Sequence, residues 1–341
     1  MSSSQLTKIR SLLKSRFPSE VLFSFAYGSG MFKQANTEEI YKVKPPTIDF
    51  IMVVPDLKNF HSMNLRENKV DYSVMSRIMP TSALSWVNSV GSGCLFMHFK
   101  EGKQSFKYGV IDEQTFLSDM MNWDKFYISA RLQKPVQILV NDANPFEFDA
   151  VLRKNRRGVL AFSILTQQLS GKKIHLSTLF KDITQLSYNG DPRVSLGAEN
   201  RSKVKNIVEG NFEGFKTWYN DEVRRLEDKE IFRVESNNMV QVTCDDYQRA
   251  ALFNDVPYNI LQKVHNDPSV LLLGQGGYTT PEAVEKLIPS LKKEMENRVR
   301  WTNLKSYTTF PLVLPVGKTI SYAAEKFRKG LMSKKSLPNK Q

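Results

Sequence analysis

Residues 25–30 read Phe-Ala-Tyr-Gly-Ser-Gly, and residues 47–51 read Thr-Ile-Asp-Phe-Ile. The first stretch ends a run of bulky apolar residues that starts at Val21, so it predicts a strand that stops at a glycine-rich turn. The second stretch opens an apolar run over 48–54, which predicts a strand buried on both faces. Asp49 therefore enters the strand that follows the Gly-Ser turn.

This pairing of a turn with an acid suits a bound triphosphate. Gly28 permits close approach of the backbone, and Ser29 adds a hydroxyl and a backbone N–H. Asp49 can hold a magnesium ion on the same phosphates. The layout is the general one of the nucleotidyltransferase fold, although a Gly-Ser pair alone is equally typical of a plain tight turn.

The surrounding pattern predicts an α+β first domain over residues 1–145. Leu6, Ile9, Leu12, Leu13 and Phe17 recur at helical spacing, whereas the basic, acid-free composition of residues 1–18 resembles a mitochondrial targeting segment. Both readings stay open. The pattern further predicts helices over 81–90 and 113–123, hairpin strands over 95–99 and 105–111, and a strand over 131–140.

Residues 146–220 are predominantly helical in pattern and predict a winged-helix-like domain. The expected helices cover 151–168, 177–186 and 203–218. Residues 221–310 predict a mixed α/β region that packs on the first two domains and contains an amphipathic helix over 281–300. Residues 311–341 are expected to form a basic amphipathic tail.

Several motifs in this order resemble the mitochondrial translocator assembly and maintenance family, the mitochondrial CDP-diacylglycerol synthases. The similarity is clear over residues 20–215 and strongest at Arg131-Leu132-Gln133-Lys134-Pro135-Val136. The other matching residues are Tyr27-Gly28-Ser29-Gly30, Phe32, Gln34, Ile48-Asp49, His61, Asn64-Leu65, Tyr72-Ser73, Lys107-Tyr108-Gly109-Val110, Asp119, Trp123, Tyr127, Leu186-Ser187-Tyr188-Asn189-Gly190-Asp191, Arg193, Gly197, Glu199, Lys203-Val204 and Asn206-Ile207-Val208.

The resemblance implies a nucleotidyltransferase domain followed by a winged-helix-like domain, with CTP between them and Mg²⁺ as cofactor. The implied reaction joins CTP to phosphatidic acid and yields CDP-diacylglycerol and pyrophosphate for cardiolipin synthesis. The phosphate of phosphatidic acid is already ionised near neutral pH, so the reaction needs cations and positioning more than a Ser-His-Asp set. The implied location is the matrix face of the inner mitochondrial membrane.

Site roles follow from these motifs as hypotheses. Ser29, Asp49, Lys107 and Arg131 are expected to carry catalysis, with Asp49 as the metal ligand. Tyr188 stacks on cytosine or packs in the core, and each Lys or Arg taken alone could be a solvated surface charge. The expected CTP-binding residues are Tyr27, Gly28, Ser29, Gly30, Lys107, Tyr108, Arg131, Lys134, Tyr188, Asp191, Arg193, Glu199 and Lys203.

The chain departs from the expected pattern at three places. The fold usually shows two acids separated by one residue on the second strand, but the second position here is Ile51. Asp56 and Asp112 are nearby candidates for further metal ligands. A histidine that precedes the Tyr-Ser element in the family is Asp71 here, and the segment over 310–317 lacks the usual lysine.

The positive charge is concentrated near the C-terminus. The chain carries a formal charge of +13, and residues 298–341 contain ten Lys or Arg and one acid, Glu325. Ile320, Phe327 and Leu331 share one helical face, which predicts a basic amphipathic helix for an anionic bilayer surface. A solvated helix or a disordered tail is the alternative. The expected membrane residues are Phe327, Arg328, Lys329, Leu331, Lys334 and Lys335.

The sequence also limits the alternatives. It contains no apolar run long enough to span a bilayer. Cys94 and Cys244, without a CxxC pair, predict two buried thiols rather than a zinc site or a disulfide framework.

The rival functions are an RNA or tRNA nucleotidyltransferase and a non-catalytic membrane assembly factor with a degenerate transferase domain. The charge is confined to a tail, which disfavours a nucleic-acid partner.

Overall fold

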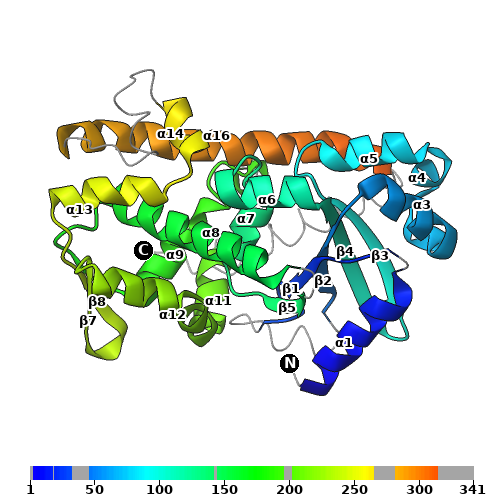
Figure 1. The fold of residues 1–341 in the computed structure, drawn as a ribbon, viewed down its shortest axis with the longest axis horizontal. Helices are drawn as coiled ribbons and strands as arrows, with labels where there is room; N and C mark the ends of the chain where they lie inside the picture. The colour runs from blue at the N-terminus through cyan, green and yellow to red at the C-terminus, as the bar shows by residue number, and fades with distance from the viewer. Residues whose placement is uncertain are drawn as a thin grey trace, which may run out of the picture.

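The computed structural model describes residues 3–17, 19–32, 46–141, 144–195, 202–264 and 281–313. A five-stranded mixed sheet with the order β3-β4-β2-β1-β5 forms the first half (Figure 1). β2 and β4 are parallel, and the other neighbouring pairs are antiparallel. The strands are β1 (Phe23–Tyr27), β2 (Ile48–Val54), β3 (Leu95–Glu101), β4 (Gln104–Asp112) and β5 (Gln137–Val140).

Both faces of this sheet are covered, as the apolar run over 48–54 predicted. Phe50 and Met52 of β2 belong to one core, and Ile51 and Val53 belong to another on the opposite face. The alternation of side chains along a strand sends neighbours to opposite faces, so an unbroken apolar strand needs two covering layers. The covering helices are α1 (Ser3–Arg16), α3 (Leu57–Glu67) and α5 (Thr81–Ser89) on the first side, and α6 (Glu113–Asn122) and α8 (Pro145–Thr166) on the second. The short α4 (Val74–Ile78) contributes no residue to either core.

The N-terminal segment is a helix that packs on the domain. Ile9, Leu13 and Phe17 are buried in the first core, and Leu6 and Leu12 pack against it. This confirms the structural reading of the spacing. The reading of residues 1–18 as a targeting segment stays a prediction.

A second sheet, with the order β6-β8-β7, anchors the other half. β8 pairs with β6 across more than sixty intervening residues, so the predicted boundary at residue 220 cuts through one structural unit. Phe180, Phe215 and Tyr219 stack at its centre. The elements are β6 (Lys173–His175), α9 (Leu176–Leu186), α10 (Pro192–Ser195), α11 (Lys203–Gly210), α12 (Phe212–Asp228), β7 (Phe232–Val234) and β8 (Met239–Val242).

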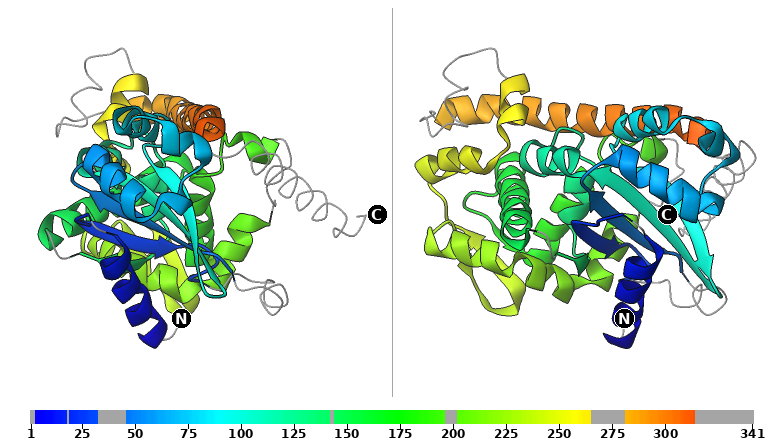
Figure 2. Two further views of the ribbon diagram at one scale, coloured as in Figure 1. Left: turned by 90° about the vertical axis from the view of Figure 1, so that its right-hand side faces the viewer. Right: turned by 45° about the vertical axis from the view of Figure 1, so that its right-hand side comes forward.

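One long helix, α16 (Pro281–Val313), runs along both halves (Figures 1 and 2). It packs on α8, on α13 (Asp246–Ala251), on α14 (Tyr258–Val264) and on α4. Two glycines let it approach the backbone of each half. A Cβ on Gly190 would lie 2.2 Å from the carbonyl oxygen of Glu296, and one on Gly91 would lie 2.8 Å from the backbone nitrogen of Ser306.

Two expectations need correction. The predicted strand over 131–140 is a short helix, α7 (Ile128–Leu132), followed by a turn and β5, because tertiary contacts described below fix the turn before α7. The predicted helix over 281–300 continues to Val313. Among the described residues, no helix is both long and apolar enough to cross a bilayer. The membrane residues expected over 327–335 lie outside the described residues.

The Gly190 contact predicts a measurable dependence of stability on α16. Gly190→Ala places a side chain at a φ of +82° and against the α16 backbone, and should lower the free energy of unfolding by about 3 kcal/mol. Gly171→Ala is the matched control, because its φ is +75° but no atom lies within 4 Å of a built Cβ. It should cost about 1 kcal/mol. Urea unfolding measures both, and equal losses would contradict the close contact.

Candidate active site

A cavity of about 400 Å³ lies between the first sheet, the second half and α16. This size is ordinary for a small-molecule site. The chain segments that line it come from four places far apart in sequence. Its walls include Tyr27, Gly28, Ser29, Phe32, Asp49, Tyr127, Ala130, Arg131, Lys134, Ser187, Tyr188, Asp191, Arg193, Lys203, Ile207, Phe215, Val299, Thr302 and Asn303.

The first wall is the predicted turn. Gly28 adopts a φ of +78°, which suits glycine, and its carbonyl accepts hydrogen bonds from the backbone N–H groups of Met31 and Phe32. A Cβ on Gly28 would lie 3.5 Å from Oδ2 of Asp49. The turn thus brings Ser29 and the Asp49 carboxylate to the same side of the cavity, as the sequence predicted.

The second wall is α7, which presents Arg131. Its guanidinium donates to the carbonyl and hydroxyl of Tyr127, and lies 3.8 Å from the centre of that ring. The buried Nε of Arg131 has no hydrogen-bond partner among the described residues. A buried N–H of a guanidinium beside an open cavity is suited to an anionic oxygen from a ligand.

One buried carboxylate fixes the turn that leads into α7. Asp119 accepts hydrogen bonds from five consecutive backbone N–H groups, those of residues 125–129, at 2.7 to 3.2 Å, and from the hydroxyl of Ser129. Asp119 is 1% exposed. Its contacts set the backbone of Tyr127 and the direction of α7, and so they place Arg131.

The end of α7 is held from the second half. Trp218 Nε1 donates to the carbonyl of Leu132, and the Tyr219 hydroxyl donates to that of Gln133. Lys134 follows, and its ammonium donates to the carbonyl of Ala130 and to the hydroxyl of Ser187, 3.1 Å away. Burial, with the nearby charges of Arg131 and Lys203, lowers the pKa of Lys134 to about 7.

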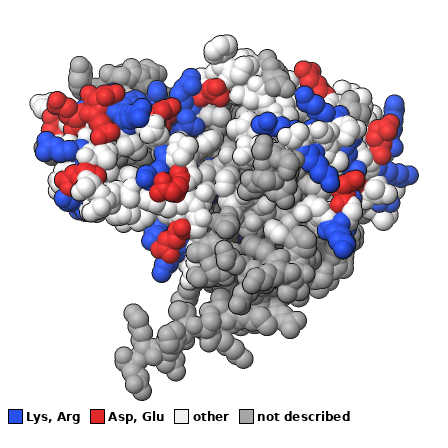
Figure 3. All heavy atoms as spheres, turned by 90° about the horizontal axis from the view of Figure 1, so that it is seen from below, with Lys and Arg blue, Asp and Glu red and all other residues white. Residues whose placement is uncertain are grey.

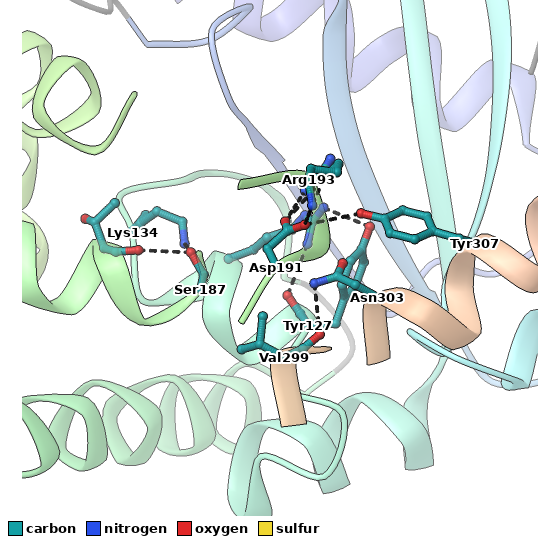
Figure 4. A network of polar contacts seen from close by, with 10 residues as sticks. Tyr127, Lys134, Ser187, Asp191, Arg193, Val299, Asn303 and Tyr307 are labelled. Carbon is teal, nitrogen blue, oxygen red and sulfur yellow. Dashed lines mark hydrogen bonds and ion pairs between the residues drawn. The ribbon is translucent and has the colours of Figure 1, made fainter. Parts of the chain in front are cut away.

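The opposite wall comes from the turn before α10 (Figure 4). Asp191 is buried and forms an ion pair with the guanidinium of Arg193, with an Nη2 to Oδ2 distance of 2.6 Å. Tyr307 points from α16 toward this pair, and its hydroxyl lies 3.4 Å from Oδ1 of Asp191. Lys203 lies over the ring of Tyr188 at 5.5 Å. The cavity therefore gathers four cationic and two anionic side chains.

The chain is similar in sequence to a family of known proteins. The family profile described as "Phosphatidate cytidylyltransferase, mitochondrial" matches residues 9–329. The chain belongs to this family. Proteins with the same name in Saccharomyces cerevisiae, Danio rerio and Mus musculus are 37%, 35% and 36% identical over about 60% of this chain.

The chain matches 52% to 59% of the length of these three relatives. A solved structure titled as a nucleotidyltransferase-like protein from Exiguobacterium sibiricum is 11% identical and covers 90% of this chain and 78% of its own. Its TM-score of 0.24 is too low to support a fold assignment.

Most of the residues expected to bind nucleotide in this phosphatidate cytidylyltransferase family member do meet at the cavity, together with Asp49, the expected metal ligand. They are Tyr27, Gly28, Ser29, Arg131, Lys134, Tyr188, Asp191, Arg193 and Lys203. Glu199 lies outside the described residues. Lys107 is paired in register with Asp49 but is not among the residues that line the cavity, and its Nζ lies 4.3 Å from the ring centre of Phe96. Burial lowers the pKa of Lys107, and the Asp49 carboxylate opposes that shift.

One expected ligand contact, that of Tyr108, is wrong. Tyr108 follows Lys107 on β4, so its side chain points to the opposite face of the sheet. It is fully buried, and its hydroxyl is 2.9 Å from both Asn64 Nδ2 and Asp71 Oδ2. Gly30 is not among the residues that line the cavity, and a Cβ there would lie 2.3 Å from the carbonyl oxygen of Thr47. Its role in binding stays a prediction.

The additional candidate metal ligands are also wrong. Asp56 and Asp112 lie at the far ends of β2 and β4, where their carboxylates accept from the backbone N–H groups of Asn59 and Thr115. Both therefore cap helices. Among the described residues, no group of three or more Asp, Glu, His or Cys side chains is arranged to hold a metal ion.

Sequence reasoning assigned no role to Tyr127, Asp119 or Tyr307. Tyr127 and Asp119 both matched family motifs. The local signal for their role was an acid, Asp119, a few residues before a turn rich in aromatic residues. Tyr307 and Asn303 carried no local signal, because α16 reaches the cavity only through tertiary packing. Cys94 and Cys244 are buried and free, as predicted.

The Asp119 contacts predict that a conservative substitution of this residue lowers stability strongly. Asp119→Asn replaces an acceptor oxygen by an NH₂ group that faces backbone donors, and should lower the free energy of unfolding by about 2–3 kcal/mol. Asp245→Asn is the control, because Asp245 caps α13 and asparagine caps helices equally well. Chemical denaturation measures both. Equal midpoints for the two variants would contradict the role of Asp119.

Lys134 predicts a proton uptake on nucleotide binding. With a pKa of about 7 it is partly neutral in the empty cleft, and a nearby phosphate would favour its charged form. CTP affinity should fall by up to about tenfold per pH unit above pH 7. Titration calorimetry in buffers of different ionisation enthalpy should show this uptake in the wild type and not in Lys134→Arg, which stays charged. The same uptake in Lys134→Met would refute the assignment to Lys134.

Proposed function

We propose that this chain transfers a cytidylyl group from CTP to phosphatidic acid, forming CDP-diacylglycerol and pyrophosphate. One observation carries the proposal: the family motifs from both halves of the chain meet at one cavity with an excess of positive charge. A triphosphate and a phosphomonoester are both polyanions. Arg131, Lys134, Arg193 and Lys203 provide the positive potential that two such substrates need in one site.

The turn and α7 would hold the triphosphate. Ser29 offers a hydroxyl at the glycine turn, and Arg131 offers the buried Nε that has no partner among the described residues. Lys134 would add charge from a fixed position, because Ser187 and the Ala130 carbonyl hold its ammonium. Tyr188 lies where a cytosine ring could stack.

Asp49 fits a magnesium ion that is bound mainly by substrate. Mg²⁺ sites that act on nucleotides often use one or two carboxylates and take further ligands from phosphate oxygens. Asp49 lines the cavity beside Gly28, and Asp191 is engaged by Arg193. Asp49 is therefore the protein ligand that we assign to Mg²⁺, which when bound offsets negative charge on the phosphates.

The reaction is a substitution at phosphorus. An ionised oxygen of the phosphatidic acid phosphate attacks the α-phosphorus of CTP, and the bond from that phosphorus to the bridging oxygen of the β-phosphate breaks. Pyrophosphate leaves with the electron pair, and no water is consumed. Arg131 and Lys134 would hold the phosphates in line and stabilise the charge that builds on the leaving group.

The finer architecture supports the same proposal. A glycine turn after β1 and an acid on β2, within a mixed sheet, is the layout expected of a nucleotidyltransferase domain. The second half shows the order helix, strand, helices, then two strands in α8, β6, α9 to α12, β7 and β8, which we interpret as a winged-helix-like domain. The family name and the basic tail lead us to place the protein at mitochondria, peripherally on the matrix face of the inner membrane.

Two other functions remain to be distinguished by experiment. An RNA or tRNA nucleotidyltransferase would need a basic groove beyond the cavity. On the face opposite α16, Lys and Arg are mixed with Asp and Glu at both ends of the molecule (Figure 3). A non-catalytic assembly factor has no need for cations, a carboxylate and a glycine turn in one cleft.

The direct test incubates purified protein with labelled CTP, Mg²⁺ and phosphatidic acid vesicles. Labelled CDP-diacylglycerol should form, and Asp49→Asn should reduce its rate by about 100-fold or more. Asp56→Asn is the matched control, because it lies past the other end of the same strand and asparagine preserves its cap. Its rate should stay within about twofold of the wild type.

The outcome separates the three functions. CTP bound without any lipid product would refute the proposed reaction and favour the assembly factor. Transfer to tRNA, or filter binding of tRNA that competes with CTP, would favour the RNA enzyme. Activity that survives removal of Mg²⁺ by a chelator would refute the metal assignment to Asp49.

A further inference from the structure

Large apolar side chains are exposed mainly at one end of the molecule. Ten such residues are exposed among the described residues, and seven of them lie in two short stretches, 70–86 and 301–304. Ile78 is 73% exposed and Trp301 is 60% exposed. We call these seven the apolar end surface: Val70, Val74, Met75, Ile78, Trp86, Trp301 and Leu304.

The two stretches are neighbours in space. α4 packs against α16, and the turn at Gly91, directly after α5, meets the α16 backbone at Ser306. Ser306 Oγ also accepts a hydrogen bond from the backbone N–H of Ser92 at 3.0 Å. Both views of Figure 2 show the end of α16 beside α5. An exposed apolar concentration of this kind marks a site of interaction.

The exposed charges around this surface are predominantly positive. Within residues 66–90 and 296–307, five cations and two acids are exposed: Arg66, Lys69, Arg77, Arg300 and Lys305, and Glu67 and Glu296. A third acid, Asp71, has a side chain that is 1% exposed and forms an ion pair with Arg16. Apolar residues that include two tryptophans, with an excess of cations around them, match the interface of an anionic bilayer.

We propose that the apolar end surface docks the folded body of the protein on an anionic lipid bilayer. The described chain also leads toward this end, because α16 runs to Val313 and the basic residues of 314–341 follow in the sequence. The docking proposal rests on the proposed function, since a lipid substrate must be reached from a bilayer.

The position of α16 gives this docking a consequence for the reaction. Val299, Thr302 and Asn303 line the cavity, whereas Trp301 and Leu304 are exposed on the same helix. A helix with its side chains is about 10 Å across. Docking through Trp301 therefore holds the cavity at roughly that distance from the bilayer surface, within reach of the headgroup of a partly extracted lipid.

The test uses the full chain and vesicles of phosphatidylcholine with or without phosphatidylglycerol, an anionic lipid that is not the proposed substrate. The triple variant Val74→Ser, Ile78→Ser, Trp301→Ser should bind the anionic vesicles about tenfold more weakly in flotation. Phe146→Ser, Tyr247→Ser is the control, because both residues are at least as exposed but lie elsewhere on α8 and α13. It should bind as the wild type does.

A second readout locates the contact. Bromine-labelled acyl chains should quench exposed tryptophan when the vesicles contain phosphatidylglycerol, and Trp301→Phe should remove part of that quenching. Vesicle binding without quenching, with the triple variant bound as tightly as the wild type, would overturn the proposal and assign binding to residues 314–341 alone. A dimer that the triple variant disrupts would assign the surface to a second copy and would likewise overturn it.

Activity separates this inference from the proposed function. With phosphatidic acid dispersed in detergent, the triple variant should form CDP-diacylglycerol at the wild-type rate, because its changes lie outside the cavity. With vesicles its rate should fall with its binding. Unchanged vesicle binding with normal detergent activity would refute the docking surface alone, whereas no product from the wild type in detergent would refute the reaction.

Discussion

The cavity depends on a single buried anion, the carboxylate of Asp119. Five successive backbone N–H groups point at it, an arrangement like an anion held at the start of a helix, but with the anion supplied by the chain itself. In a low-dielectric interior such charge-assisted bonds are strong and directional. They hold the chain after α6 in a tight turn, and this turn sets the direction of α7 toward the cavity. Together with the contacts of Trp218 and Tyr219 at the other end of α7, they fix the positions of Tyr127 and Arg131.

The cavity is a composite of both halves, so its shape depends on how the halves are joined. α12 holds the end of α7 through Trp218 and Tyr219, and α16 touches each half through a glycine. Arg298 adds a hydrogen bond from α16 to the carbonyl of Trp123, in the same turn that Asp119 organises. These contacts are short and involve backbone atoms, which makes them intolerant of small shifts.

The parts of the site that the sequence predicted are local. The Gly28 turn and Asp49 could be recognised because a strand, a turn and a second strand leave a pattern within thirty residues. Tyr108 was misplaced although alternation along β4 contained the answer: if Lys107 faces Asp49, its neighbour faces the other core. Arg131 and Lys134 were expected on a strand, because the β-branched residues of β5 dominate that stretch and Asp119, which fixes the turn, lies twelve residues before Arg131.

Other features had no local pattern to reveal them. β6 pairs with β8 across a long stretch of chain, so the helical periodicity after residue 146 could not show where the second unit ends. Tyr307 meets Asp191 from 116 residues away in the sequence. These are tertiary outcomes that override local propensity.

The packing of α16 against Gly91 and Gly190 also affects the order in which the parts of the molecule fold. The two halves can each begin to form as their own residues leave the ribosome, since domains generally fold as units from the N-terminal side. The cavity, however, is complete only when α16 supplies Val299, Thr302 and Asn303 to its lining. For that, α16 must be synthesised and must form contacts with residues more than two hundred positions earlier in the chain. Such distant closures are slow. The nucleotide site would therefore be the last part of the molecule to mature, after both cores are in place.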